Sequence, residues 1–183
     1  MGKLSLPDPA GLFCAILAAD QDAIQLGRER LIQSFGELAA ESETIPFVFT
    51  TYYEAEMGPG LVKQLVGFRE LIQMGGLPQI KLETNRIEAE TGAGTSEELK
   101  RKINLDPGYV TLAKVVLATT KNRDHRIYLG SGIFAEVTLR YRHGRYAAQE
   151  WTYPDYESEQ AGRFFLQMRA HVAHALASEA SSV

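Results

Sequence analysis

The feature that most constrains how this chain can fold is a series of β-rich segments between Val110 and Trp151. The segments are VTLAKVVLATT, HRIYL, IFAEVTLRYR and RYAAQEW, and β-branched and aromatic residues recur in each of them. Between the second and third segments, GSG at 130–132 is typical of a three-residue hairpin loop. The HG pair at 143–144 is typical of a two-residue loop. The series therefore predicts an antiparallel meander.

The two loops also predict the register of this meander. Counting outward from the first loop pairs Leu129 with Ile133. The same register pairs Arg126 with Glu136, and the second loop then places Trp151 opposite Glu136. Successive residues of a strand point to opposite faces of a sheet. We therefore expect a core face made of Ile133, Ala135, Val137, Leu139 and Tyr141, and a mixed face made of Phe134, Glu136, Thr138 and Arg140.

Arg126 and Glu136 allow two interpretations. As a cross-strand ion pair beside Trp151 they would contribute about 0.2–1 kcal/mol and need no function. Alternatively, this face is the floor of a pocket, where Arg126 holds an anionic group and Glu136 acts as orienter, general base or metal ligand. The preceding residues 121–124 are either a solvated turn or, together with His125, part of the same site.

The N-terminal half predicts a strand, a helix and further strands. The apolar run at 12–18 is short and ends at polar residues, as buried strands do. Asp20 or Asp22 can cap the helix that follows, and Gly36 lies where that helix would end. IPFVFTTYYEAEM predicts a second strand, which GPG at 58–60 closes. LVKQLVGF is either a third strand or the first turns of a helix.

Two further helices are predicted. Pro78 suits the first turn of a helix that ETGAG ends at 90–94, and the Asp-Pro-Gly of the following NLDPGY is a turn signal. SEQAGRFFLQMRAHVAHALA predicts a C-terminal helix, with SEASSV at 178–183 as a frayed tail. The buried stripe of that helix is predicted to be Phe164, Phe165, Met168, Val172, Ala175 and Leu176.

This order of elements predicts one α+β domain over residues 1–183, with an ordered core at 9–177. The order strand, helix, strand, third strand, helix and strand suits a ferredoxin-like β-α-β core. The antiparallel β-meander and the C-terminal helix would extend that core. A length of 183 residues fits one domain of this kind.

Composition argues against several classes of function. Hydrophobic residues make up 45% and charged residues 23% of the chain, which disfavours disorder and coiled coil. A net charge of -4 gives no general attraction for phosphate backbones, so nucleic acid is not an expected partner. No run approaches the roughly 20 apolar residues that span a membrane. Cys14 is the only cysteine, so no intramolecular disulfide can form, and we expect a cytoplasmic protein.

A second polar set lies on KLETNRIE, where four residues share one face of the predicted helix. These residues are Lys81, Thr84, Asn85 and Glu88. The face could recognise a phosphate or a sugar, although a solvated helix surface has the same pattern.

Tyr53 and Glu56 lie near the end of the predicted second strand. Asp106 in NLDPGY is either a turn cap or an oxygen ligand for magnesium. The motifs GxxxxGK[ST], GxSxG, HExxH and CxxC are absent.

Several blocks together resemble a known family. YYEAEMGPGL, KLETNRIE, NLDPGY, LATTKNRDHRIYLGSGIFAEVTL and WTYPDY are similar to the signature blocks of a bacterial and archaeal family called domain of unknown function 4416. The family has no established activity. The resemblance implies that the polar members of these blocks share a pocket, namely Tyr53, Glu56, Lys81, Thr84, Asn85, Glu88, Asn104, Asp106, Lys121, His125, Arg126, Glu136, Thr138, Trp151 and Asp155.

We therefore expect a polar cleft between the meander and the KLETNRIE helix that holds an anionic small molecule, such as a nucleotide or a phosphorylated metabolite. Glu136, His125 and Lys121 are the candidate catalytic residues, and Glu56 and Asp106 the candidate magnesium ligands. The candidate ligand-binding residues are Lys81, Thr84, Asn85, Glu88, Arg126, Thr138, Trp151 and Tyr53. The alternative is a noncatalytic protein-interaction domain that uses the aromatic WTYPDY segment. Convergence of the charged residues in one pocket would favour the ligand hypothesis, whereas an exposed aromatic patch would favour the alternative.

Overall fold

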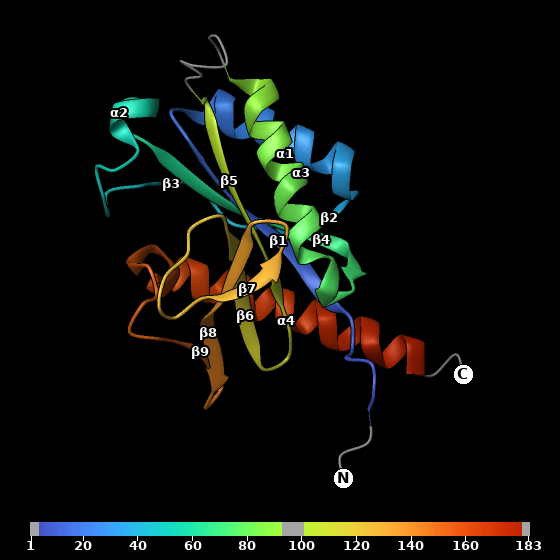
Figure 1. The fold of residues 1–183 in the computed structure, drawn as a ribbon. Helices are drawn as coiled ribbons and strands as arrows, with labels where there is room; N and C mark the ends of the chain where they lie inside the picture. The colour runs from blue at the N-terminus through green and yellow to red at the C-terminus, as the bar shows by residue number, and fades with distance from the viewer. Residues whose placement is uncertain (1–3, 93–100, 181–183) are drawn as a thin grey trace.

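One antiparallel sheet organises the computed structural model, which describes residues 4–92 and 101–180 (Figure 1). In spatial order its main strands are β2 (Leu38–Glu41), β4 (Val62–Ile72), β1 (Ala10–Ala18), β5 (Ile103–Val110), β6 (Lys114–Thr119), β8 (Ile133–Arg142) and β7 (Ile127–Gly130). Two short strands join it, β3 (Ile45–Pro46) beside β4 and β9 (Arg145–Ala148) beside β8. The helices are α1 (Gln21–Phe35), α2 (Glu54–Met57), α3 (Leu77–Thr91) and α4 (Glu159–Ala180), with 3₁₀ turns η1 (Met74–Gly76) and η2 (Pro154–Glu157). The described chain is thus a single α+β domain.

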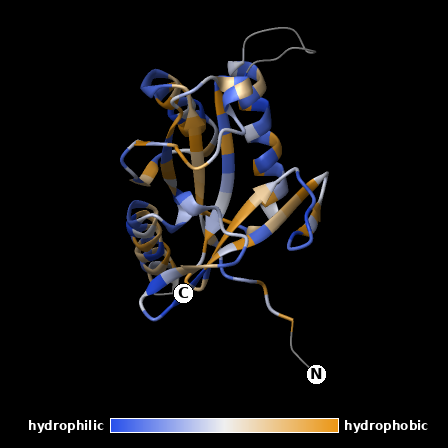
Figure 2. Ribbon diagram, turned by 90° about the vertical axis from the view of Figure 1, so that its left-hand side faces the viewer, coloured by the Kyte–Doolittle hydropathy of each residue, from blue (hydrophilic) through white to orange (hydrophobic). Residues whose placement is uncertain are grey.

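Helices cover both faces of the central strands (Figure 1). On one face Phe13 of β1 packs against Phe165 and Met168 of α4. On the other face Ile16 of β1 packs with apolar residues of α1 and α3, including Ile87. Hydrophobic residues accordingly run along the central strands, whereas the helices mix hydrophobic and hydrophilic residues (Figure 2). Burial on both faces explains why β1 is a continuous apolar run.

The ends of two predicted helices can be compared with the structure. Asp20 caps α1 by accepting a hydrogen bond from Ala23 N at 2.8 Å, and Gly36, with φ of 88°, ends the helix as predicted. In α4 the predicted stripe is buried at Phe164, Phe165, Met168 and Val172. The helix runs on to Ala180, so the tail predicted at 178–183 begins too early, and 181–183 lie outside the described residues. The helix α3 ends at Thr91, followed by Gly92, and so ends within the predicted terminator at 90–94, of which 93 and 94 lie outside the described residues.

Two predictions about local structure are wrong. Only Ile45–Pro46 of IPFVFTTYYEAEM is a strand, and Glu54–Met57 at its end forms the short helix α2. NLDPGY is not a turn but lies within β5. The strand alternative for LVKQLVGF is correct, because the segment falls in β4. No helix within 4–92 and 101–180 is long and apolar enough to cross a membrane.

The loops of the meander set its register largely as predicted. Ile127 pairs with Ala135, and Arg142 pairs with Arg145, as predicted. Next to the first loop, however, Ile133 pairs with Gly130 and not with Leu129 as predicted, because the register shifts between Tyr128 and Gly130. However, β9 ends at Ala148, so Trp151 does not pair with Glu136 as predicted.

A β-bulge in β8 overturns the predicted core face of this strand. The pairing of β6 with β8 shifts between Val115 and Val116, which leaves Thr138 as the extra residue. Beyond the bulge the alternation reverses. Leu139 packs in the cluster that contains α4, whereas Ile133 packs in a separate cluster with the start of α3. The odd residues from 133 to 141 therefore do not share one face.

The strands β5 and β6 pair over only part of their length. Their ladder joins Gly108 to Leu117, Tyr109 to Val116 and Val110 to Val115, and no pair precedes Gly108 in β5. The residue before Gly108 is Pro107, whose nitrogen has no hydrogen to donate. Proline is tolerated in a strand where one side needs no partner. Residues 103–107 of β5 therefore continue beside β1 alone, and the sheet divides at this point.

Candidate functional site

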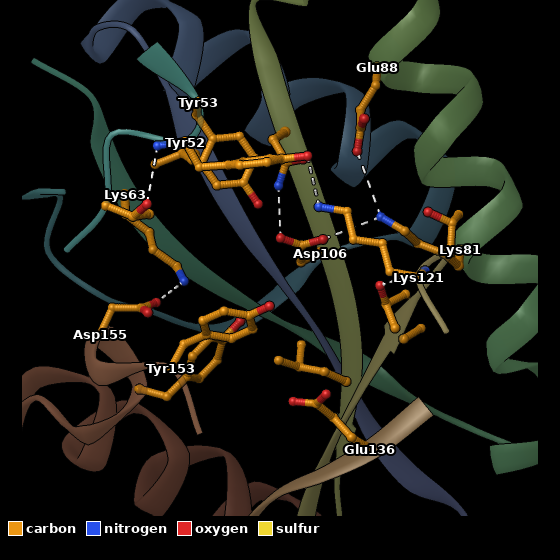
Figure 3. A pocket seen from close by; sticks show the side chains of 18 of the residues that line it. Tyr52, Tyr53, Lys63, Lys81, Glu88, Asp106, Lys121, Glu136, Tyr153 and Asp155 are labelled. Carbon is orange, nitrogen blue, oxygen red and sulfur yellow. Dashed lines mark hydrogen bonds and ion pairs between the residues drawn. The ribbon is translucent and has the colours of Figure 1, made fainter. Parts of the chain in front are cut away.

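A cavity of about 240 Å³ lies where β5 and β6 diverge (Figure 3). Its walls come from β4, β5, β6, β8 and α3, with the segment before α2 and the turn η2 at its rim. Its described lining residues are Leu17, Phe47, Thr50, Tyr52, Tyr53, Lys63, Lys81, Asn85, Glu88, Arg101, Asn104, Asp106, Leu117, Ala118, Thr119, Thr120, Lys121, Arg126, Glu136, Tyr153, Asp155 and Tyr156. Charged and tyrosine side chains thus converge from segments that are far apart in the sequence.

Side chains of α3 take the place of the strand that β5 lacks. Lys81 Nζ donates a hydrogen bond of 2.7 Å to the carbonyl oxygen of Leu105, and Glu88 Oε1 accepts one of 2.8 Å from Leu105 N. The buried backbone groups of this residue are therefore satisfied by a helix rather than by β6. The helical spacing of Lys81 and Glu88 makes this double contact feasible, because residues seven apart share a helix face.

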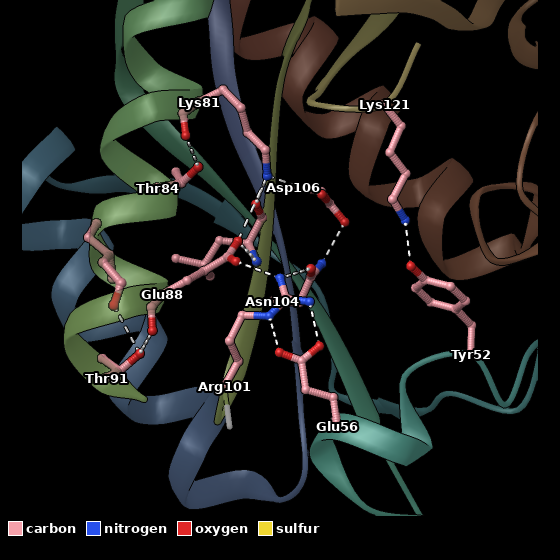
Figure 4. Close-up of polar contacts among 12 residues, drawn as sticks. Tyr52, Glu56, Lys81, Thr84, Glu88, Thr91, Arg101, Asn104, Asp106 and Lys121 are labelled. Atoms are coloured by element: carbon pink, nitrogen blue, oxygen red, sulfur yellow. Dashed lines mark hydrogen bonds and ion pairs between the residues drawn. The ribbon is translucent and has the colours of Figure 1, made fainter. Parts of the chain in front are cut away.

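Charge compensates the burial of these groups (Figure 4). Lys81 Nζ lies 3.4 Å from Asp106 Oδ1 and 3.8 Å from Glu88 Oε1. Burial raises the pKa of Glu88, although the charge of Lys81 opposes that shift. Burial acts on Asp106 in the same sense, but the positive charges of Lys81 and Lys63 prevail and hold the pKa of Asp106 below its usual value.

Arg101, which precedes β5, joins three elements around this group (Figure 4). Its guanidinium donates to both oxygens of Glu56 on α2, at 2.6 and 2.7 Å, and to Glu88 Oε2 at 2.8 Å. It also donates to Asn104 Oδ1 at 3.1 Å. These hydrogen bonds lower the pKa of Glu56. Arg101 therefore attaches the segment around α2 to α3 and β5.

The carboxylates proposed as magnesium ligands are engaged with protein cations. Glu56 faces Arg101, and Asp106 faces Lys81 and accepts a hydrogen bond of 2.7 Å from Asn104 Nδ2. Across residues 4–92 and 101–180, no three His, Cys, Asp or Glu side chains are grouped so as to hold a metal ion. The geometry of Glu56 and Asp106 thus gives the magnesium hypothesis no support.

The end of the cavity formed by β8 centres on Glu136, whose side chain is 2% exposed. Arg126 Nε donates to Glu136 Oε2 at 2.7 Å, and His125 Nε2 lies 2.9 Å from the same oxygen. Arg126 Nη1 also donates to the carbonyl oxygen of Lys121 at 2.9 Å. The other carboxylate oxygen, Glu136 Oε1, is buried and has no hydrogen-bond partner among the described residues.

Lys121 differs from the other basic residues of the cavity. Lys63, Lys81, Arg101 and Arg126 each have a carboxylate within 4.0 Å. Lys121 has none in the part of the chain that the structure describes. Its Nζ instead donates to the hydroxyl of Tyr52 at 3.2 Å and lies 4.3 Å from the centre of that ring. Among the described residues, the ammonium group of Lys121 therefore contacts the Tyr52 side chain but no carboxylate.

The opposite rim holds two residues, Lys63 and Tyr156, that sequence analysis did not assign to the pocket. Lys63 of β4 forms an ion pair with Asp155, and its Nζ lies 4.2 Å from the centre of the Tyr156 ring. Burial raises the pKa of Tyr156, and its hydroxyl has no partner among the described residues. Asp155 was implicated by the family resemblance. Lys63 carried no comparable signal, because a lysine in LVKQLVGF is an ordinary feature of a half-exposed strand.

The predicted site residues fall into two groups. Those that line the cavity are Tyr53, Lys81, Asn85, Glu88, Asp106, Lys121, Arg126 and Glu136, together with Asn104 and Asp155, which only the family resemblance had implied. The remaining predicted residues, Glu56, Thr84, His125, Thr138 and Trp151, do not line it. Thr84 Oγ1 donates to the carbonyl oxygen of Lys81, and the ring of Trp151 stacks on His125 with centroids 5.2 Å apart. Among the lining residues, Lys63, Arg101, Tyr52, Tyr153 and Tyr156 were not predicted.

The fold and the site define a single-domain α+β protein with a charged, tyrosine-rich cavity in a divided antiparallel sheet. The model of the family described as "Domain of unknown function (DUF4416)" matches residues 8–171. The chain therefore belongs to the DUF4416 family, as its sequence blocks predicted. No curated protein and no solved structure matches the chain.

Proposed function

We propose that this protein binds a small anionic molecule, such as a nucleotide or a phosphorylated metabolite, in the cavity between β5, β6 and α3. The observation that carries the proposal is the position of Lys121, a cavity-lining cation with no carboxylate partner in the described chain. A bound anion would supply the missing counter-charge. Lys121 is itself exposed, so water and salt screen part of this attraction.

The aromatic rim is consistent with this proposal. Tyr52 and Tyr153 line the cavity and are 64% and 50% exposed, so parts of their rings remain available to a ligand. Ligand sites typically combine aromatic walls with a few convergent polar groups. Within such a site Glu136, His125 and Lys121 are the groups that we propose for acid-base or electrostatic catalysis, if the ligand is also a substrate.

The alternative, a protein-interaction surface on WTYPDY, has less support. Tyr156 is 4% and Asp155 6% exposed, so the second half of the segment faces the interior. Trp151 is partly exposed, but its indole N–H donates to the carbonyl oxygen of Val137 at 3.0 Å. The aromatic residues therefore do not gather in one exposed patch, whereas Lys81, Arg126 and Glu136 line one cavity.

We further propose that the first half of the fold is a ferredoxin-like core. The elements β1, α1, β2, β4, α3 and β5 follow one another in sequence, apart from short insertions. The spatial strand order β2-β4-β1-β5, antiparallel throughout, supports this assignment. The meander then adds β6, β8, β7 and β9 at the edge next to β5.

Binding can be tested by thermal-shift measurements and calorimetry with nucleotides and sugar phosphates. A ligand that binds only the folded protein raises the melting temperature through mass action. We expect at least one anionic ligand to do so, and we expect Lys121→Ala to abolish the effect. Lys114→Ala is the matched control, because Lys114 is the first residue of β6, the strand that leads to Lys121, but does not line the cavity. Absence of binding by every anion, or full binding by Lys121→Ala, would contradict the proposal.

A further inference from the structure

We infer that the anionic ligand carries an aromatic ring, which packs against the side chain of Tyr52 at the rim of the cavity. This inference rests on the proposed function and narrows its ligand class to aromatic anions, such as nucleotides and aryl phosphates. Sugar phosphates without a base would then be poor ligands. Three features of Tyr52 support the inference, namely the aromatic row behind it, the exposure of its ring and its contact with Lys121.

Tyr52 is the outermost member of an aromatic row that begins in the core. Phe47 and Tyr53 pack against a buried cluster that includes Met57 of α2. The rings of Phe47 and Tyr53 meet edge to face with centres 6.3 Å apart, and those of Tyr53 and Tyr52 do so at 5.0 Å. Tyr52 itself belongs to none of the hydrophobic clusters among the described residues. Its ring therefore ends the row at the cavity instead of filling the core.

The Tyr52 side chain is accessible to a ligand and is already held in position. Tyr52 lines the cavity and is 64% exposed. A single exposed tyrosine is a normal feature of a protein surface. The Tyr52 ring, however, is fixed on one side by Tyr53 and at its hydroxyl by Lys121, which donates to it at 3.2 Å (Figure 4). A side chain that is ordered before binding loses little conformational entropy when a ligand packs against it.

The same side chain lies directly beside the proposed anion site. The group that contacts Tyr52 is the ammonium of Lys121, which is also the group that would bind the anion. Its Nζ lies nearer to the Tyr52 hydroxyl, at 3.2 Å, than to the ring centre, at 4.3 Å. A ligand whose anion pairs with Lys121 therefore has its neighbouring atoms at the Tyr52 ring, and a ring a few bonds from the anion can make both contacts.

Charge determines which chemical group suits the exposed ring. The face of an aromatic ring attracts cations, but a cationic group of the ligand would be repelled here by Lys121. A neutral group is therefore favoured. An aliphatic group gains only the burial of apolar surface, whereas an aromatic ring also gains the offset-stacked or edge-to-face contact of an aromatic pair. An aromatic ring on the ligand would extend the row of Phe47, Tyr53 and Tyr52 by one member.

The test compares pairs of anions in which one member has an aromatic ring and the other has none. The pairs are phenyl phosphate with cyclohexyl phosphate, and each of the four common ribonucleoside 5′-monophosphates with ribose 5-phosphate. Affinities for the wild-type protein are measured by calorimetry or by titration followed with NMR. In at least one pair we expect the aromatic member to bind more tightly, by about threefold or more for phenyl phosphate and about tenfold or more for a nucleotide.

Substitution of Tyr52 then identifies the residue that the ring contacts. Tyr52→Leu keeps an apolar side chain but removes the ring, so the preference for the aromatic member should fall below about twofold. Tyr52→Phe keeps the ring and should retain the preference. The control is Tyr128→Leu, since Tyr128 on β7 is 60% exposed but does not line the cavity, and this variant should behave as the wild-type protein does. Because Tyr52 lies outside the core clusters, we expect its variants to fold.

The outcomes separate this inference from the proposed function. If both members of every pair bind equally well to the wild-type protein, anion binding stands and the inference of an aromatic ring is wrong. The inference is also wrong if only anions without an aromatic ring bind. If no anion binds at all, the proposed function fails as well. An unchanged aromatic preference in Tyr52→Leu would exclude Tyr52 as the contact.

Discussion

Leu105 and Lys81 are joined by a hydrogen bond of 2.7 Å from the lysine ammonium to the backbone carbonyl oxygen. Because Glu88 accepts from the N–H of the same residue, two charged side chains of α3 satisfy a stretch of β5 that has no partner strand on that side. The charged face of the KLETNRIE helix is therefore buried, and its Lys81 and Glu88 stabilise the fold whether or not a ligand is bound. Any ligand in the cavity meets charges that are already partly compensated.

The first prediction concerns this compensation. Lys81→Met should lower the free energy of unfolding by about 3 kcal/mol, because it removes the buried cation that Glu88 and Asp106 share and leaves Leu105 with an unsatisfied carbonyl oxygen. Denaturant unfolding measures the loss. The double variant Lys81→Met/Glu88→Gln should recover part of it, since one of the two carboxylates that Lys81 had faced is then neutral. Equal stability of wild type and Lys81→Met would show that the buried ion pair contributes nothing.

The second prediction concerns acid stability. The folded-state pKa of Asp106 is held below its unfolded value, so the unfolded chain binds the proton more readily. This contribution to stability is present above the unfolded pKa of about 3.9 and is lost as the pH falls through the folded-state pKa. Urea unfolding at pH 5 and at pH 3.5 should show a smaller decrease for Asp106→Asn than for the wild-type protein. An identical decrease in both proteins would count against the ionised Asp106 described here.

The third prediction contrasts the buried Tyr156 with the partly buried Tyr146. The hydroxyl of Tyr156 has no partner among the described residues, whereas that of Tyr146 donates to the carbonyl oxygen of Thr111 at 2.7 Å. Tyr156→Phe should therefore leave the free energy of unfolding unchanged or raise it. Tyr146→Phe should lower it by about 1 kcal/mol, the usual value of one hydrogen bond. Thermal and urea unfolding of both variants would show whether this order holds, and the reverse order would contradict it.

Sequence analysis succeeded where the deciding interactions are local. The hairpin loops around Gly132 and Gly144 set the register of the meander, because loop length determines which residues pair. Predictions from the sequence were wrong where contacts with residues distant in the chain determine the local conformation. Asp106, Pro107 and Gly108 form a strong turn signal, yet pairing with β1 keeps them extended. The bulge at Thr138 depends on the partner strand β6 and leaves no mark in the sequence of β8 itself.

The same distinction applies to the candidate site. Arg126 and Glu136 could be predicted as neighbours, because one hairpin brings them together and a 2.7 Å contact joins them. The convergence of Lys63, Arg101 and the KLETNRIE helix on the same cavity required the tertiary fold. A lone lysine or arginine at a strand end has no sequence signature that separates a cavity wall from a solvated surface.

The short ladder between β5 and β6 has a mechanical consequence. Three residue pairs connect the sheet of the first half of the chain to the strands of the meander, and the cavity lies in the gap beyond them. A molecule bound there would touch both parts and act as a bridge between them. Ligand binding should therefore couple the unfolding of the two parts more tightly, so that the occupied protein melts over a narrower temperature range than the empty one.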